Sequence, residues 1–471
     1  MFDDDYEDDR PKIRAAVGQF EAMLKKHETC FFDLATYENM IEYYEDRNDF
    51  DKIEKVLDFA LEQYPYSSYF LIKKAGLELM DKHYRLAHEL LDRAELLDPS
   101  ELTIYILRSD SYLYQANYMK AVEVLRYALM ICSPESKPEL LLELADVYEE
   151  WEHYDEVFDT LRHVLNQQPE NEEALSRMWY SVVLSGRFEE SIDFHTALID
   201  KVPYSYWAWY NLGLSYHELG MYEKAIDAFE FVFAINDKSD LAYCDCAESY
   251  FKLKNYNKAI EYFEKAIEFA KPYEAIHYSI GVCYEKLKNY HKARQYYRKA
   301  IAADSKFDMA HFRVGETYRK QKQWKNAIHS YDRALQINNG KHDYIISCAE
   351  VYFKSNNTEG VVKMADAFIK SINNTVSFSH VKKIMHYLFE TDNFSKALDL
   401  NHKISEETEF GAATFYIEAA GLYALGKKSQ SLTAFEYAAS VLFSGHRLAF
   451  YLNPALLNDE AVQLILEQYK K

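Results

Sequence analysis

The chain has 471 residues and a formal net charge of −22, with 54 Lys and Arg against 76 Asp and Glu. Because an acidic chain repels phosphate backbones, this balance argues against a general nucleic-acid binder. Gly (13) and Pro (9) are scarce while Tyr (41) and Phe (28) are abundant, which favours an all-α chain over a sheet protein rich in Gly and Pro turns.

The beginning of the chain carries no recognisable targeting signal. The first residues, MFDDDYEDDR, have neither the basic start nor the apolar run of a signal peptide, and no apolar stretch of about 18 residues follows. Six Cys spread over the whole length do not suggest a disulfide framework, and reduced thiols are typical of the cytosol. We therefore expect a soluble, cytoplasmic protein without a membrane span.

The first 33 residues divide into two parts. Residues 1–10 are dominated by acidic side chains, and we expect them to form a disordered tail. Residues 11–33 include PKIRAAVGQFEAMLKKHE, in which apolar residues recur at helical spacing. This second part is predicted to be an N-terminal capping helix.

From residue 34 onward the sequence repeats every 34 residues. The segment WAWYNLGLSYHELGMYEKAIDAFEFVFAIN aligns with AYCDCAESYFKLKNYNKAIEYFEKAIEFA after one such shift, and with AIHYSIGVCYEKLKNYHKARQYYRKAIAAD after a second. Residues 446–471, which include NPALLNDEAVQLILEQYKK, are predicted to close the array as a C-terminal cap. With two-residue slips at 136–137 and 376–377, the repeat gives units at 34–67, 68–101, 102–135, 138–171, 172–205, 206–239, 240–273, 274–307, 308–341, 342–375, 378–411 and 412–445.

Each unit has the pattern of a helical hairpin. Numbered 1 to 34, a unit carries Gly, Ala or Ser at position 8 in nine of twelve cases, and Ala at position 20 in seven. Position 11 is Tyr in eight units and position 17 is aromatic in ten. Small residues allow two antiparallel helices to approach closely, and rings fill the space beside them. A single hairpin buries only one face, so the units must stack on one another to be stable.

This pattern resembles the tetratricopeptide repeat (TPR) over about residues 34–445. The shared features are an apolar or aromatic residue at position 4, a small residue at 8, Tyr at 11, Ala at 20, an aromatic at 24 and Ala at 27. The resemblance implies an all-α fold, a right-handed superhelical solenoid of about twelve hairpins with capping helices at both ends. It also implies a concave groove, lined by the first helix of each hairpin, that binds a partner segment. A bacterial protein is expected.

In the TPR geometry, positions 2, 5, 9, 12 and 13 face the groove. The predicted groove therefore combines flat apolar anchors with charges that orient a bound peptide. A simpler interpretation is that some of these rings only pack against the next repeat, and that Lys is common near a hairpin turn. The rings are Tyr180, Trp207, Tyr210, Phe251, Tyr278, Phe312, Phe353, Phe389, Tyr416 and Tyr423, and the charged residues are Lys252, Lys286, Lys320, Lys354, Glu248, Glu316 and Glu350.

Charge is distributed unevenly along the chain. Residues 1–200 carry a net charge of −24, residues 201–471 carry +2, and the stretch 251–340 within the latter carries about +9. One hypothesis is that the acidic repeats dock a basic surface, either of a foreign protein or of a second copy in a head-to-tail arrangement. The alternative is that the acids only keep a Tyr-rich chain soluble.

Catalytic and cofactor motifs are missing from the sequence. There is no P-loop, G-x-G-x-x-G, G-x-S-x-G or H-E-x-x-H motif, and the residues outside the repeats are too few for a separate catalytic domain. We therefore predict no enzyme activity, no cofactor and no metal, and a protein or peptide partner. The alternative function is a single-stranded RNA-binding solenoid that uses the Lys and ring residues, although the neighbouring Glu residues would repel phosphates.

The second repeat departs from the template. Lys74 occupies position 7 and Glu78 position 11, where Leu and Tyr usually stand. Because they are four residues apart on a helix, each could partly satisfy the other. We expect instead that local repacking exposes both side chains.

Overall fold

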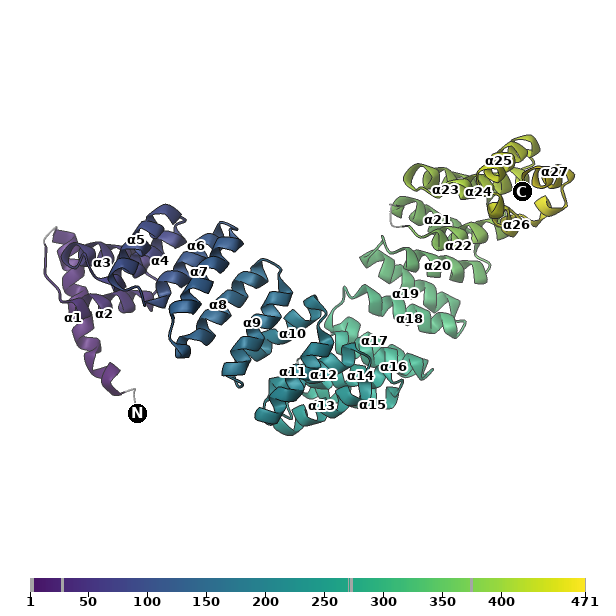
Figure 1. The fold of residues 1–471 in the computed structure, drawn as a ribbon. Coiled ribbons are helices and arrows are strands. Elements are labelled where there is room, and N and C mark those ends of the chain that lie inside the picture. The colour runs from purple at the N-terminus through teal and green to yellow at the C-terminus, as the bar shows by residue number, and fades with distance from the viewer. Residues whose placement is uncertain (1–3, 27–28, 270, 272–273, 373–375, 471) are drawn as a thin grey trace. The chain divides into compact units, whose positions relative to one another are not determined.

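The computed structural model describes residues 4–26, 29–269, 271, 274–372 and 376–470. Throughout these ranges the regular structure is helical, with 27 α-helices, three short 3-10 helices and no strand (Figure 1). This is the all-α fold that the composition and the repeat predicted. The chain divides into two compact units, Met1–Asn236 and Asp237–Lys471.

The first unit contains helices α1 to α13 and one 3-10 helix. After α1, the helices alternate as first and second members of successive hairpins. Consecutive helices pack against each other, and first helices of neighbouring hairpins also touch, as α4 and α6 do. The elements are α1 (Asp4–Lys26), α2 (Leu34–Glu45), α3 (Phe50–Gln63), α4 (Ser68–Met80), α5 (Tyr84–Leu97), α6 (Leu102–Tyr114), α7 (Tyr118–Ile131), η1 (Pro134–Ser136), α8 (Lys137–Glu150), α9 (Tyr154–Gln167), α10 (Glu172–Ser185), α11 (Phe188–Lys201), α12 (Tyr206–Glu218) and α13 (Tyr222–Ile235).

The second unit continues the alternation from α14 and ends in short elements. Its last helix begins at the cap Asp459, which accepts a hydrogen bond from the backbone N–H of Ala461, and it buries Val462 against the repeats. The elements are α14 (Asp240–Lys252), α15 (Tyr256–Phe269), α16 (Glu274–Lys286), α17 (Tyr290–Ala303), α18 (Asp308–Lys320), α19 (Trp324–Ile337), α20 (His342–Lys354), α21 (Thr358–Ser371), α22 (Phe378–Glu390), α23 (Phe394–Glu407), α24 (Ala412–Ala424), α25 (Lys428–Val441), η2 (Phe443–Gly445), α26 (His446–Leu452), η3 (Pro454–Asn458) and α27 (Glu460–Tyr469).

The turn inside each hairpin uses the same backbone device. The residue at position 15 has a positive φ in every one of the twelve units, yet it is Gly in only three of them. A left-handed residue ends the first helix and lets the chain reverse into the second. The residues are Asn48, Lys82, Ala116, Glu152, Gly186, Gly220, Lys254, Lys288, Lys322, Asn356, Asp392 and Gly426.

This device predicts opposite effects for one substitution and its reverse. Ala116 has a φ of 54°, which costs an L-residue about 1–2 kcal/mol, so we expect Ala116→Gly to raise the free energy of unfolding by about 0.5–1 kcal/mol. Gly186 has a φ of 73° and an added Cβ would touch nothing within 4 Å, so Gly186→Ala should lower it by a similar amount through the backbone alone. Hydrogen exchange across α6–α7 and α10–α11 measures both. A loss of stability in Ala116→Gly would contradict the argument.

Small residues at position 8 create the close approach of the two helices. A Cβ built on Gly213 would lie 2.7 Å from the ring of Phe229, and one on Gly281 would lie 2.5 Å from Tyr297. Both rings are at position 24 of the same unit, and both are almost fully buried. The predicted fit of small residues beside rings is confirmed at these sites.

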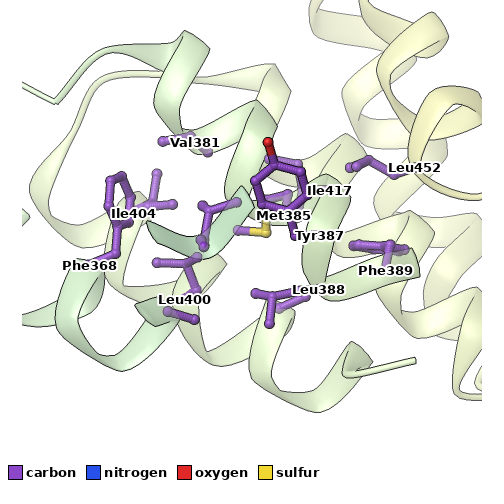
Figure 2. Close-up of a cluster of buried hydrophobic side chains, with 14 of the residues drawn as sticks. Phe368, Val381, Met385, Tyr387, Leu388, Phe389, Leu400, Ile404, Ile417 and Leu452 are labelled. Atoms are coloured by element: carbon purple, nitrogen blue, oxygen red, sulfur yellow. The ribbon is translucent and has the colours of Figure 1, made fainter. Parts of the chain in front are cut away.

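The largest core cluster lies in the second unit. Figure 2 shows part of it, where Met385 and Leu388 from α22 meet Leu400 from α23 and Ile417 from α24. All four side chains are essentially inaccessible to solvent. Three consecutive helices thus share one core, as stacked hairpins require.

The tail predicted over residues 1–10 overlaps helix α1, which begins at Asp4, and residues 1–3 lie outside the described residues. Its disorder stays a prediction.

The expectation about Lys74 and Glu78 is wrong. Both side chains are buried rather than exposed, at 9% and 7% exposure. The ammonium of Lys74 lies 2.9 Å from Glu54 and 3.0 Å from Asp58, which α3 supplies, and 3.6 Å from Glu78. Burial lowers the pKa of Lys74, but the hydrogen bonds to Glu54 and Asp58 outweigh it and the net shift is upward. The charges are therefore neutralised inside the core.

Candidate functional site

The candidate site is the face formed by the first helices of successive hairpins. Several residues predicted to face a groove are instead buried. Tyr210 is 8% exposed, Glu316 8%, Phe389 5% and Tyr416 0%. These four are core residues, which corrects the groove set proposed from the sequence.

Position 5 explains two of these corrections. A ring at this position packs against the ring at position 24 of the same hairpin, with centroids 6.0 Å apart for Tyr210 and Phe229 and 5.4 Å for Tyr416 and Phe435. Tyr278 and Phe312 make the same contact with Tyr297 and Tyr331, at 5.6 and 5.4 Å. Position 5 therefore belongs to the packing between the two helices of a hairpin.

Buried carboxylates in the second unit are satisfied by the chain itself. Glu285, on α16, accepts hydrogen bonds from the hydroxyl of Tyr297 at 2.8 Å and from the ammonium of Lys320 at 2.7 Å. Glu316, on α18, accepts from the hydroxyl of Tyr331 and from the guanidinium of Arg319, which donates at 3.1 and 2.7 Å.

These bonds reach across neighbouring repeats. Arg319 also donates to Glu350 at 3.1 Å, and Glu350 accepts from Lys354 on its own helix. The predicted Lys and Glu ladders therefore form intramolecular ion pairs at Lys320, Glu316, Glu350 and Lys354. Glu285 and Arg319 complete these pairs but were not recognised from the sequence. Glu285 could have been recognised, because it occupies position 12 of its unit, one of the positions expected to face the groove.

Other predicted residues remain accessible. Glu248, Lys252 and Lys286 are exposed, and their side chains form no ion pair or hydrogen bond within the described residues. Tyr180 is 58% exposed, and its ring is arranged edge to face with that of Tyr154. The remaining rings are half-buried, with Trp207 beside Tyr206, Phe251 beside Tyr256, Phe353 stacked on Tyr387 of the next hairpin, and Tyr423 donating to Asp459.

The first unit has a different concave surface. A cavity of about 840 Å³ lies against α4, between the C-terminal end of α2 and helix α6. Apolar side chains dominate its lining, with Ile72 and Leu107 among them and Met80 and Tyr114 exposed at 61% and 63%. It was not identified from the sequence, because the residues predicted to face the groove all come from the fifth repeat onward.

Carboxylates continue from this cavity onto the next first helix. Asp110 lines the cavity on α6, and Glu143 and Asp146 follow on α8. Burial, together with the neighbouring negative charges, raises the pKa of Glu143 to about 7 and that of Asp110 to about 6. Asp146 pairs with Arg177, whereas Asp110 and Glu143 have no ion pair or side-chain hydrogen bond among the described residues.

The described part of the chain contains no group of three or more His, Cys, Asp or Glu residues placed to hold a metal ion. None of its helices combines the length and apolar character needed to traverse a lipid bilayer.

Stacked helical hairpins with a small residue set against a ring in their cores define an all-α repeat protein. Residues 204–271 and 240–306 match one family described as tetratricopeptide repeat, and residues 309–341 match a second family with the same description. The chain therefore contains tetratricopeptide repeats. No curated protein matches it.

Several solved structures resemble parts of the chain. The crystal structure of MamA is 21% identical, with 34% of this chain and 94% of that chain covered and a TM-score of 0.33. YrrB, described as a TPR protein with an unusual peptide-binding site, is 19% identical over 38% of this chain and 91% of its own, with a TM-score of 0.32. The Naa15/Naa10 complex bound to HypK-THB is 15% identical over 92% of this chain and 65% of that chain, with a TM-score of 0.38.

Proposed function

We propose that this chain is a non-enzymatic scaffold that binds a segment of a partner protein along the concave face of its repeats. The observation that carries the proposal is a set of exposed side chains, Glu248, Lys252 and Lys286 on the first helices α14 and α16, that form no ion pair or hydrogen bond within the described residues. These exposed charges stand beside the half-buried ring of Phe251 on α14, and together they supply both orientation and contact area for a peptide.

Site-specific photo-crosslinking tests the face that binds. A benzophenone amino acid placed at Phe251 or Tyr180 should capture a partner protein in the native cell, because both lie on first helices. The matched control is Tyr437, which is 53% exposed but stands on the second helix α25. Capture only from Tyr437 would place binding on the outer helices and contradict the proposal.

Charge reversal tests the role of the lysines. In the Lys252→Glu/Lys286→Glu variant we expect the crosslink yield from Phe251 to fall at least fivefold, since two exposed cations become anions without loss of any internal contact. An unchanged yield would remove these lysines from the site. Adducts that disappear after ribonuclease treatment, with a salt-sensitive shift of a labelled single-stranded oligonucleotide, would instead favour the RNA-binding alternative.

A further inference from the structure

We propose that the cavity against α2, α4 and α6, together with the carboxylates that continue onto α8, binds a peptide segment in which bulky apolar residues stand beside Lys or Arg. The inference rests on one part of the proposed function, namely that the face formed by the first helices binds a segment of a partner protein. It concerns a different surface, however, in the other unit from Lys252 and Lys286, and so it can fail separately.

The apolar part of the surface calls for apolar side chains. Ile72 and Leu79 form a buried wall, and Met80 and Tyr114 expose most of their surface at the rim. Gly76 lies in this wall, and a Cβ added there would meet nothing within 4 Å, so the helix backbone itself borders open space. A volume of about 840 Å³ is within the range of ligand sites, about 300–1,000 Å³, and accommodates several side chains of a peptide.

The charged part of the surface calls for cations. Asp110 and Glu143 are partly buried without a cationic partner among the described residues, and Arg177 nearby is already held by Asp146, Glu149 and Glu173. Of the two lysines in the cavity lining, Lys73 pairs with Glu45 at 2.7 Å, and Lys82 stands at the hairpin turn.

A comparison with the second unit shows how unusual this is. There the buried carboxylates Glu285 and Glu316 each accept hydrogen bonds from a Tyr and from a cation of the chain itself. Desolvated charge without a counter-charge is unfavourable, so Asp110 and Glu143 leave a charge that a bound Lys or Arg can complement. The wide apolar cavity beside them favours a peptide over a small polyamine.

The same carboxylates give the interaction a pH dependence. Glu143 faces Asp110, Asp146, Glu139 and Glu173, and its pKa of about 7 means that it is largely neutral at pH 5.5. Asp110, with a pKa of about 6, loses part of its charge over the same range. Affinity for a cationic segment should therefore increase from pH 5.5 to pH 8.

A random peptide library displayed on phage provides the test. The full chain is used to select 16-residue peptides at pH 8, in parallel with Asp110→Asn/Glu143→Gln and with Gly76→Leu, which places a side chain in the cavity. Gly18→Leu is the matched control, because Gly18 also lies in a helix with open space around its Cβ but does not line the cavity. Circular dichroism verifies that each variant retains its helix content.

We expect the selected peptides to combine Lys or Arg with bulky apolar residues. Labelled copies should bind at least tenfold more weakly to Asp110→Asn/Glu143→Gln and to Gly76→Leu, and equally well to Gly18→Leu and to the Lys252→Glu/Lys286→Glu variant. The proposal would be overturned if the selection enriched no peptides, or if the selected peptides had no excess of Lys or Arg. It would also be overturned if both cavity variants bound the selected peptides as tightly as the wild type does.

Sedimentation at low and high salt tests whether a second copy of the chain occupies the cavity. A salt-sensitive dimer that Asp110→Asn/Glu143→Gln abolishes would mean that a second copy of the chain occupies the cavity, and this too would overturn the proposal. A monomer at every salt concentration, together with the selected basic peptides, supports it. If photo-crosslinking from Phe251 captured no partner while the peptide selection gave the expected result, only the proposed function would be rejected.

Discussion

Replacing Lys74 by methionine should lower the free energy of unfolding of the surrounding repeats by about 3–5 kcal/mol. The ammonium of Lys74 is the cation shared by Glu54, Asp58 and Glu78, and Glu78 is 7% exposed. Without it, Glu78 keeps only His83, whose ring nitrogen lies 2.8 Å from the carboxylate. An uncompensated carboxylate is then left in the core. Urea unfolding combined with hydrogen exchange across α3–α5 measures the loss.

A double substitution separates charge from shape. Lys74→Leu/Glu78→Tyr places an apolar residue at position 7 and the Tyr that eight other repeats carry at position 11, and it removes both buried charges together. Replacement of a buried ion pair by packed apolar residues is often neutral or stabilising by about 1–4 kcal/mol, so we expect the double variant to reach at least the wild-type stability. If Lys74→Met alone were neutral, the buried network would not stabilise the fold in the way that its geometry indicates.

The helical repeat was predictable because each unit repeats the same local chemistry. A small residue stands at position 8 in nine units, and an aromatic ring stands at position 24 in the four consecutive units from 206 to 341. The structure sets Gly213 against Phe229 and Gly281 against Tyr297. Periodicity of this kind is visible in a single sequence. It carries no information on how one helix pair presents its rings to the next.

The concave surface was harder to predict for that reason. A ring such as Tyr210 fits the core or the groove equally well by type, and only the contact with Phe229 decides between them. Likewise, the recurrence of Lys and Glu in the sequence did not indicate that Glu316 accepts a hydrogen bond from Tyr331 of the same hairpin. Side chains that pair across helices become visible only when the helices are placed.

Net charge gave partial guidance to the acidic site. The excess of acidic residues in residues 1–200 indicated an acidic surface. A net charge summed over 200 residues does not, however, distinguish carboxylates that are solvated or paired with Arg from partly buried carboxylates without a cationic partner. Asp110 and Glu143 are distinguished by their burial beside an apolar cavity. That cavity is lined by residues of the first three repeats, whereas every residue predicted to face the groove comes from the fifth repeat onward.

Replacing Gly315 by alanine should lower the free energy of unfolding of its hairpin by about 2 kcal/mol, although alanine is the better helix former. A Cβ at this position would lie 2.5 Å from the ring of Tyr331, which is fully buried. The hydroxyl of Tyr331 donates to Glu316, and this bond resists a shift of the ring. Overpacking costs about 1–3 kcal/mol, and we expect a cost near the upper limit here because the ring cannot move freely. Alanine regains about 1 kcal/mol in helix propensity, so the net loss is about 2 kcal/mol.

The same substitution at Gly76 provides the control for Gly315→Ala. Gly76 also lies within a first helix, but its Cβ would meet nothing within 4 Å, so Gly76→Ala should raise stability by up to about 1 kcal/mol. Hydrogen exchange in α18–α19 for Gly315→Ala and in α4–α5 for Gly76→Ala measures the two effects locally, since the repeats need not unfold as one unit. Equal effects at the two positions would show that helix propensity, and not the fit of small residue against ring, controls position 8. Opposite signs would mean that the contact between Gly315 and Tyr331 fixes the approach of the two helices, as the recurrence of small residues at position 8 implies for the other repeats.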